Sequence, residues 1–196
     1  MNSALSELAA WPTKFWVRAV LIQNLAGQLQ DLAGSSKSLS NSADRAHLIK
    51  LRNSADLVIT GASTIRIENP PAPTTKMWVL SNSGELSDQA KVFQSSQTSV
   101  VTTKPINHLP SITLDQITPA KLLEKAKSEN LTRILLEGGS QVFNQFIAAG
   151  LIDDALITLV DRVGAGDIVH RARFGLTLTQ QIRTAELTIQ RWGKEG

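Results

Sequence analysis

The fold of this chain is decided by residues 131–146, which read LTRILLEGGSQVFNQF. The short apolar run from Ile134 to Leu136 lies between a charged residue and a glycine pair, which is typical of a buried strand. After the glycines, apolar residues recur at the spacing of one helix face that ends near Gly150, at Val142, Phe143, Phe146 and Ile147. The stretch therefore predicts a strand, a Glu-Gly-Gly turn and a helix.

The Glu-Gly-Gly turn has two interpretations. Because Gly138 and Gly139 lack a Cβ, a ligand can approach the backbone there, and the free N–H groups of the next helix point toward it. The partial positive charge of a helix N-terminus suits a phosphate group. Alternatively, the glycines only form a tight turn that packs the helix on the strand, because the fuller glycine-rich fingerprint is absent.

Composition predicts one globular domain over residues 1–196. The 196 residues are enough for one well-filled core, and 42% of them are apolar. The apolar runs are far shorter than a membrane span, and the first residues lack the basic and apolar regions of a signal peptide. We therefore expect a cytoplasmic protein with no membrane partner.

The residue inventory also restricts the chemistry. The chain has no cysteine, which excludes disulfides, thiolate catalysis and cysteine-bound metals. Its three histidines, His47, His108 and His170, lie far apart in sequence, so we expect no metal site. The net charge of +3 is modest and the basic residues are scattered, so we expect no nucleic-acid partner.

Strand and helix signals alternate along most of the chain. Besides the strand at 134–136, strands are predicted at residues 14–22, 56–60, 77–80, 99–102, 112–114, 154–160 and 184–192. Helices are predicted from Asn41 or Ser42, either of which can be the cap, to about Arg52, and from Pro119 to Lys127. Prolines 70, 71 and 73 predict an extended loop, and residues 164–166 a turn. This alternation predicts an α/β fold with a central, largely parallel sheet.

Several predicted strands end in small or hydroxyl residues. Because the carboxyl ends of parallel strands meet at one edge of a sheet, these donors are expected to lie together where ligands bind in open α/β folds. Such an edge indicates an extended anionic ligand such as a dinucleotide, although small polar residues also end strands for reasons of turn geometry. The four strand ends are residues 61–64, 81–83, 102–103 and 138–140.

Three charged residues lie close to this edge. Glu68 is placed on the loop after the strand at 56–60, and Glu137 at the tip of the strand at 134–136. Either could be an ordinary surface carboxylate, but the neighbours of Glu137 are core residues. Arg52 either complements the dipole of its helix or forms a phosphate clamp that faces the same edge.

Two segments together resemble a known family, the reductase domain of riboflavin biosynthesis. Residues 44–52 and 55–69, DRAHLIKLR and ADLVITGASTIRIEN, resemble its helix-Leu-Arg, Ala-Asp, strand and Gly-x-x-Thr pattern, which is followed by an acid. The Leu-Glu-Gly-Gly of residues 136–139, continued by Phe143 and by Gly150-Leu151-Ile152-Asp153, is similar to its second signature. The resemblance extends from about Lys14 to Trp192.

This resemblance implies a dihydrofolate-reductase-like, three-layer fold, NADPH as cofactor and a homodimer. It implies the reduction of 5-amino-6-(5-phosphoribosylamino)uracil, a phosphoribosylamino-pyrimidine, to the ribitylamino product. Glu68 and Glu137 would be the catalytic acids, facing substrate or nicotinamide. On the substrate side it places Asn24, Lys37, Ser40 and Arg52. Cofactor contacts would come from Gly61 and Thr64, from Ser81 and Ser83 near the adenosine end, and from Gly138, Gly139, Ser140 and Gln141 around the pyrophosphate.

The chain also departs from the family pattern. Asn24-Leu25-Ala26-Gly27 stands where the family has Ser-Leu-Asp-Gly, and residues 72–76 stand where it has Leu-Thr-x-Arg. Related chains add one more strand after the last one predicted here, at 184–192. Two alternatives therefore remain. One is a reductase of the same fold acting on another small substrate such as a pterin, and the other is a non-catalytic nucleotide-binding or dimer scaffold, which Ala26 favours.

Overall fold

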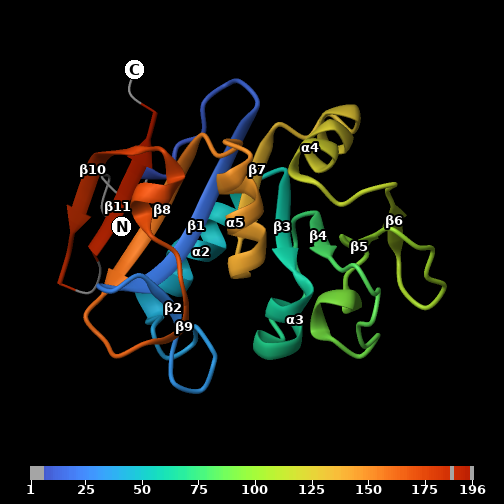
Figure 1. Cartoon of the computed structure of the whole chain (residues 1–196), viewed down its shortest axis with the longest axis horizontal. Helices are drawn as coiled ribbons and strands as arrows, with labels where there is room; N and C mark the ends of the chain where they lie inside the picture. Colours follow the sequence, from blue (N-terminus) through green and yellow to red (C-terminus); the bar gives the residue numbers. More distant parts are fainter. Residues whose placement is uncertain (1–6, 186–187, 195–196) are drawn as a thin grey trace.

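The computed structural model describes residues 7–185 and 188–194, and within them a nine-stranded sheet forms the centre of the molecule (Figure 1). Its strands follow the order β10-β11-β8-β1-β7-β3-β4-β5-β6. All neighbours from β8 to β6 are parallel, whereas β11 and β10 are antiparallel additions at one edge. The strands are β1 (Trp16–Asn24), β3 (Leu57–Gly61), β4 (Met77–Leu80), β5 (Thr98–Thr102), β6 (Ser111–Thr113), β7 (Arg133–Glu137), β8 (Asp154–Val160), β10 (Thr177–Arg183) and β11 (Thr188–Gly193).

Helices cover both faces of the sheet, which gives three layers. On one face, α4 (Pro119–Ser128) and α5 (Ser140–Ala148) share a core with Ile134 and Leu136 of β7. On the other, α2 (Ser42–Ser54) and α3 (Ala62–Glu68) share a second core with Leu135. Successive residues of β7 are thus buried on opposite faces, as a strand between two layers requires. Two short 3-10 helices are formed by Lys91–Gln94 and Arg171–Phe174.

The predicted helix starts are confirmed by their caps. The side chain of Asn41 accepts a hydrogen bond from the backbone N–H of Asp44 at 2.9 Å, and α2 begins at the next residue, Ser42. Thr118 caps α4 in the same way, with Pro119 in the first turn, where its missing N–H costs nothing. No helix in the described ranges is long and apolar enough to cross a membrane.

A second, two-stranded sheet pairs β2 (Gln28–Gln30) with β9 (Ala165–Ile168), and we call it the β2–β9 ribbon. The sequence predicted only a turn at 164–166, and this is wrong for Ala165 and Gly166, which begin β9. The pattern was missed because three of the four β9 residues are exposed and the strand contains glycine. Figure 1 shows the ribbon and α3 at the same end of the main sheet, toward which β3 and β8 run.

Three further predicted positions are wrong, and one strand was not predicted. Glu68 is the last residue of helix α3 and does not lie on a loop. The final strand begins at Thr188, not at residue 184, while residues 186 and 187 lie outside the described residues. Strand β10 was not predicted at all, because Ile182 is its only buried residue and the apolar alternation of a core strand is missing. The first strand also begins two residues later than predicted, at Trp16, and continues to Asn24.

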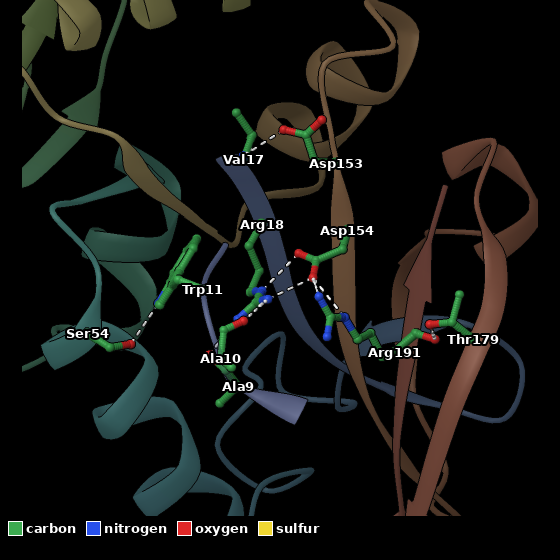
Figure 2. A network of polar contacts seen from close by, with 10 residues as sticks. All are labelled: Ala9, Ala10, Trp11, Val17, Arg18, Ser54, Asp153, Asp154, Thr179 and Arg191. Carbon is green, nitrogen blue, oxygen red and sulfur yellow. Dashed lines mark hydrogen bonds and ion pairs between the residues drawn. The ribbon is translucent and has the colours of Figure 1, made fainter. Parts of the chain in front are cut away.

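A buried arginine connects the central strands (Figure 2). Arg18 on β1 is fully buried, with 0% of its surface exposed. Its Nε and Nη2 donate to the two carboxylate oxygens of Asp154 on β8 at 2.8 and 2.7 Å. Arg191 on β11 approaches the same carboxylate, with its Nε donating at 3.0 Å. Two guanidinium groups therefore share one buried carboxylate across three neighbouring strands.

The same arginine attaches the segment before β1 to the sheet. Arg18 donates to the backbone carbonyls of Ala9 and Ala10 at 2.8 and 3.0 Å, and its guanidinium lies 4.5 Å from the ring centre of Trp11. The Trp11 indole N–H in turn donates to Ser54 Oγ on α2 at 2.8 Å. With Leu8 fully buried as well, this segment closes the second core.

Candidate functional site

A large cleft opens beside the carboxyl ends of β3 and β7, between α2 and α3. Its volume is about 780 Å³. Thr60, Glu137 and the Gly138–Gly139 turn line it from the sheet, and side chains of α2, α3 and the 34–40 loop form its other walls. The gathering of strand ends at one edge, predicted from the sequence, is confirmed, because β7, β3, β4 and β5 are consecutive parallel neighbours.

The strongest polar contact in the cleft joins Arg52 of α2 to Glu137 of β7. Arg52 Nε donates to Glu137 Oε1 at 2.7 Å and to Oε2 at 2.9 Å, and Nη2 donates to Oε2 at 2.5 Å. Only 9% of the Glu137 side chain and 24% of the Arg52 side chain are exposed. Burial lowers the pKa of Arg52, but the charge and hydrogen bonds of Glu137 outweigh it, so that this pKa lies above its ordinary value. Glu137 is therefore not a surface carboxylate, and Arg52 does more than complement a helix dipole.

Glu68 fastens the loop that borders the cleft. From the end of α3, its Oε1 accepts hydrogen bonds from Ser35 Oγ at 3.0 Å and from the backbone N–H of Ser36 at 2.8 Å. Both Glu68 and the neighbouring Lys37 line the cleft. The loop is folded on itself by Asp31, whose carboxylate accepts from the Ser38 hydroxyl and from two backbone N–H groups. Glu68 thus positions the loop that carries Lys37.

Asp44 and His47 are cleft residues whose surroundings could not be read from the sequence. The Ser40 hydroxyl donates to Asp44 Oδ2 and the Thr158 hydroxyl to Oδ1, each at 2.7 Å, so both carboxylate oxygens have partners. His47 is 7% exposed, and burial lowers its pKa, which keeps the imidazole neutral near pH 7. The one available signal for Asp44 was its place three residues after the helix cap Asn41, which is the spacing of a capping box.

Two glycine turns contact each other at the edge of the cleft. Gly138 and Gly139 have φ values of +71° and +83°, which residues other than glycine rarely adopt. A Cβ added at Gly138 would lie 3.4 Å from Thr64 Oγ1, and one at Gly139 would lie 3.8 Å from the Cα of Gly61. Both interpretations of the turn therefore have support, since the glycines pack the turns together and also leave the backbone open to the cleft.

The first turn of α5 lies next to these glycines. Gly139 provides no side-chain cap, and the first turn holds no acidic residue. Ser140 and Gln141 line the cleft, and the Ser140 hydroxyl donates a hydrogen bond to Asp167 Oδ2 of the β2–β9 ribbon. Asp167 also lines the cleft, and nothing in the sequence indicated it, because it follows the turn predicted at 164–166 and belongs to no predicted element.

Four of the residues assigned to the site from the sequence are not among those that line the cleft. The side-chain amide of Asn24 stabilises the turn into β2. Its oxygen accepts a hydrogen bond from the Gln28 backbone N–H and its nitrogen donates one to the Gln28 side chain, both at 2.9 Å. Ser81 and Ser83 accept hydrogen bonds from backbone N–H groups within their own turn. Gly61 is separated from the cleft by its neighbours but contacts the Gly139 turn. Their binding roles stay predictions, as do those of the residues in the cleft.

The segment that replaces Leu-Thr-x-Arg supplies no cation to the cleft. Its Lys76 pairs with Glu129 at 2.7 Å and is not among the lining residues. In the part of the chain that the structure describes, no group of three His, Asp or Glu side chains could hold a metal ion.

The family model of the RibD C-terminal domain matches residues 15–187 of the chain. A curated relative, the riboflavin biosynthesis protein RibD of Aquifex aeolicus (strain VF5), is 25% identical over 159 residues, which cover 72% of this chain and 45% of that protein. The chain therefore spans about half the length of the curated relative that it matches.

Solved structures share the fold at low sequence identity. A diaminohydroxyphosphoribosylaminopyrimidine deaminase/5-amino-6-(5-phosphoribosylamino)uracil reductase from Thermotoga maritima is similar with a TM-score of 0.77 and 17% identity, over 93% of this chain and 57% of that one. A pyrimidine reductase-like protein from Corynebacterium diphtheriae gives 0.76 and 20%, over 93% and 92%. A dihydrofolate reductase from Enterococcus faecalis, complexed with NADP(H), gives 0.59 and 12%, over 92% and 97%. The chain thus has a dihydrofolate-reductase-like α/β fold and, by the match over most of its length, belongs to the RibD C-terminal domain family.

Proposed function

We propose that this chain is an NADPH-dependent reductase that converts 5-amino-6-(5-phosphoribosylamino)uracil to its ribitylamino product. The observation that carries this function is the buried Arg52–Glu137 pair, which lies in the same cleft as the Gly138–Gly139 turn. The cleft volume of about 780 Å³ is within the usual range for small-molecule sites. The reductase activity named for the Thermotoga protein and the NADP(H) of the dihydrofolate reductase add support.

The described residues fit a dinucleotide at the glycine edge. Gly138 and Gly139 would let a pyrophosphate reach the backbone, and the N–H groups at the start of α5, with Ser140 and Gln141, would hold it. Thr64 stands beside Gly138 and would contact the same ligand. When bound, reduced nicotinamide supplies the hydride, and the protein supplies orientation and exclusion of water.

Glu137 and Arg52 would orient the ribosyl part of the substrate. Arg52 makes three hydrogen bonds to the two Glu137 oxygens, and each oxygen still has acceptor capacity for a sugar hydroxyl. No hydrogen bond joins Arg52 Nη1 to another described residue, so it is available as a donor to the substrate. A bidentate ion pair with little exposure holds both groups in one geometry before the substrate arrives, which reduces the cost of ordering them.

Glu68 would act on the substrate side together with the loop that it fastens. Lys37 extends from this loop and Ser40 lies where the loop enters α2, so all three border one end of the cleft. We further propose that residues 1–196 form one cytoplasmic reductase domain, that it works as a homodimer, and that neither nucleic acid nor membrane is its partner.

The test is steady-state oxidation of NADPH by the purified chain, with and without the phosphoribosylamino-pyrimidine. We expect oxidation that requires the pyrimidine and falls in Glu137→Gln, but not in Glu85→Gln, which removes an exposed carboxylate outside the cleft. A dihydropterin in place of the pyrimidine tests the same-fold alternative. Turnover with the pterin alone would contradict the proposed substrate and retain the reductase.

The second candidate is a nucleotide-binding or dimer scaffold without catalysis. It is favoured by Ala26, which is exposed in the turn between β1 and β2 where the resembled pattern has an acid. NADPH binding without turnover of either substrate would support this scaffold. Restoration of turnover in Ala26→Asp would then identify the missing acid as the cause.

A further inference from the structure

The β2–β9 ribbon places a carboxylate at the start of α5. Asp167 lies on β9, and its Oδ2 accepts a hydrogen bond from the hydroxyl of Ser140, the first residue of the helix. The two residues lie 27 positions apart in sequence and on different elements, so this contact is tertiary. Asp167 is exposed and lines the cleft.

The Asp167 carboxylate brings a negative charge next to this helix end. A helix N-terminus carries partial positive charge and unpaired N–H groups, which a negative group stabilises. Helix α5 supplies no such group itself, because Gly139 has no side chain and the first turn holds no acid. The ribbon therefore provides the negative charge that the helix lacks. The pyrophosphate of the proposed cofactor would need the same position.

The charges around the cleft make this competition significant. Four cationic and four anionic side chains line it, so its formal charge is balanced. Without Asp167 the balance would be +1. The lining groups are Lys37, Arg45, Arg52 and Arg66, and Asp44, Glu68, Glu137 and Asp167. Of the four acids, Asp44, Glu68 and Glu137 hold α2 or the loop, and only Asp167 contacts α5.

Few backbone pairs hold the ribbon together around Asp167. β2 and β9 pair only at Gln28 with Ile168 and at Gln30 with Ala165, and the register shifts between these pairs, opposite Asp167. The base of the ribbon is anchored, because the buried Val169 donates its backbone N–H to the Gly27 carbonyl at 3.0 Å. A two-stranded ribbon with few hydrogen bonds opens locally at low cost.

We propose that Asp167 is a specificity-determining residue of the cofactor site, whose carboxylate is held beside the N-terminus of α5 by the Ser140 hydroxyl until the pyrophosphate of a dinucleotide displaces it. This role rests on the proposed function, because it assigns the pyrophosphate to this helix. Displacement breaks the Ser140–Asp167 hydrogen bond and frees the Ser140 hydroxyl for the ligand. The β2–β9 ribbon then loses its contact with α5 and becomes more mobile. The acid sets how strongly a ligand must be charged to enter, since a weakly charged one does not displace it.

The first measurement is NADPH affinity, by fluorescence titration, for wild type, Asp167→Asn and Asp161→Asn. Asparagine keeps the shape of the side chain and still accepts a hydrogen bond, so the variant isolates the charge. A pair of unit charges a few ångströms apart in water changes affinity by about fivefold, and a pyrophosphate carries more than one charge. After screening by salt we expect about tenfold tighter binding in Asp167→Asn, equivalent to about 1.4 kcal/mol.

Asp161→Asn is the matched control. It removes the same charge from an exposed residue that precedes the ribbon and does not line the cleft. Its Kd should stay within about twofold of wild type, because exposed charges at a distance are largely screened. Competition with inorganic pyrophosphate should show the same gain in Asp167→Asn, whereas competition with adenosine, which carries no phosphate, should show none.

The second measurement is hydrogen exchange of the ribbon amides, residues 28–30 and 165–168. Exchange should become faster when NADPH or inorganic pyrophosphate is added to wild type, because the Ser140–Asp167 contact is lost. Equal Kd values in all three proteins, or unchanged or slower ribbon exchange in wild type, would refute the role of Asp167 and leave the reductase in place. Failure of all three proteins to bind NADPH or pyrophosphate would overturn both the role of Asp167 and the proposed reductase function. Binding of NADPH by Asp167→Asn alone would support the role of Asp167, with a larger effect on affinity than expected.

Discussion

Replacement of Asp154 by asparagine should destabilise the fold strongly, because two guanidinium groups depend on its carboxylate. Arg18 is 0% exposed and only 1% of the Asp154 side chain is exposed. The Arg18 hydrogen bonds measure 2.8 and 2.7 Å, and the Arg191 Nη2 lies 2.9 Å away. In Asp154→Asn one oxygen remains to accept a hydrogen bond, but the buried Arg18 charge loses its counter-charge.

Removal of one partner from such a buried pair costs about 3–5 kcal/mol. For a chain of this size each kcal/mol lowers Tm by about 2–4 °C, so Tm should fall by about 6–20 °C. Urea unfolding followed by tryptophan fluorescence would measure the free energy. The control is Asp115→Asn, which breaks a surface ion pair with Lys121 at 3.8 Å. It should change the free energy of unfolding by less than about 0.5 kcal/mol. A loss below about 1 kcal/mol in Asp154→Asn would refute the reasoning, since the carbonyls of Ala9 and Ala10 would then be sufficient partners for Arg18.

Three other predictions concern the cleft and the loss of stability at acid pH. Glu137→Gln should lower kcat/KM by about ten- to a hundredfold, since charge-assisted bonds contribute about 1.5–3 kcal/mol, while the Kd for NADPH stays near that of Glu85→Gln. An equal kcat/KM in the two variants would move the active site elsewhere. NADPH should bind more tightly than NADH, because hydroxyls at the strand ends can receive a 2′-phosphate; equal Kd values would contradict this. Burial raises the pKa of Asp56, but hydrogen bonds from Arg133 and Thr132 outweigh it and hold that pKa well below its ordinary value. Its stabilisation is therefore present above about pH 4 and lost as pH falls, so wild type should exceed Asp56→Asn in unfolding free energy at neutral pH by a margin that narrows in acid. A constant margin would contradict the assignment.

The sequence predicted the elements whose side chains are buried on a regular period. β7 and α5 were found because an apolar run changes from continuous to helical spacing at Gly138 and Gly139. α3 was missed because only Ala62 and Ile65 of its seven residues are buried, and its β-branched residues resemble a continued strand or loop. β10 was missed because an edge strand exposed on both faces has no apolar alternation.

The site was predictable in its location but not in its contacts. Glu137 was indicated by its place between core residues and a glycine turn, and this local signal was sufficient. Its partner Arg52 lies 85 residues away, so the ion pair exists only through the packing of α2 on the sheet. Asp167 required the pairing of β2 with β9, which residues 28–30 and 165–168 do not reveal by composition.

The position of β1 in the sheet has a consequence for the synthesis of this chain. Among the strands of this sheet β1 is made before both of its neighbours, which come from much later in the sequence, with Trp16 paired to Arg133 and Arg18 to Asp154. Until β7 and β8 emerge, β1 has neither of its neighbouring strands and the buried Arg18 lacks its counter-charge, Asp154. Pairing over so long a stretch is slow, and nascent chains of up to about residue 150 should expose an unpaired central strand. Such intermediates are the species that a chaperone would recognise.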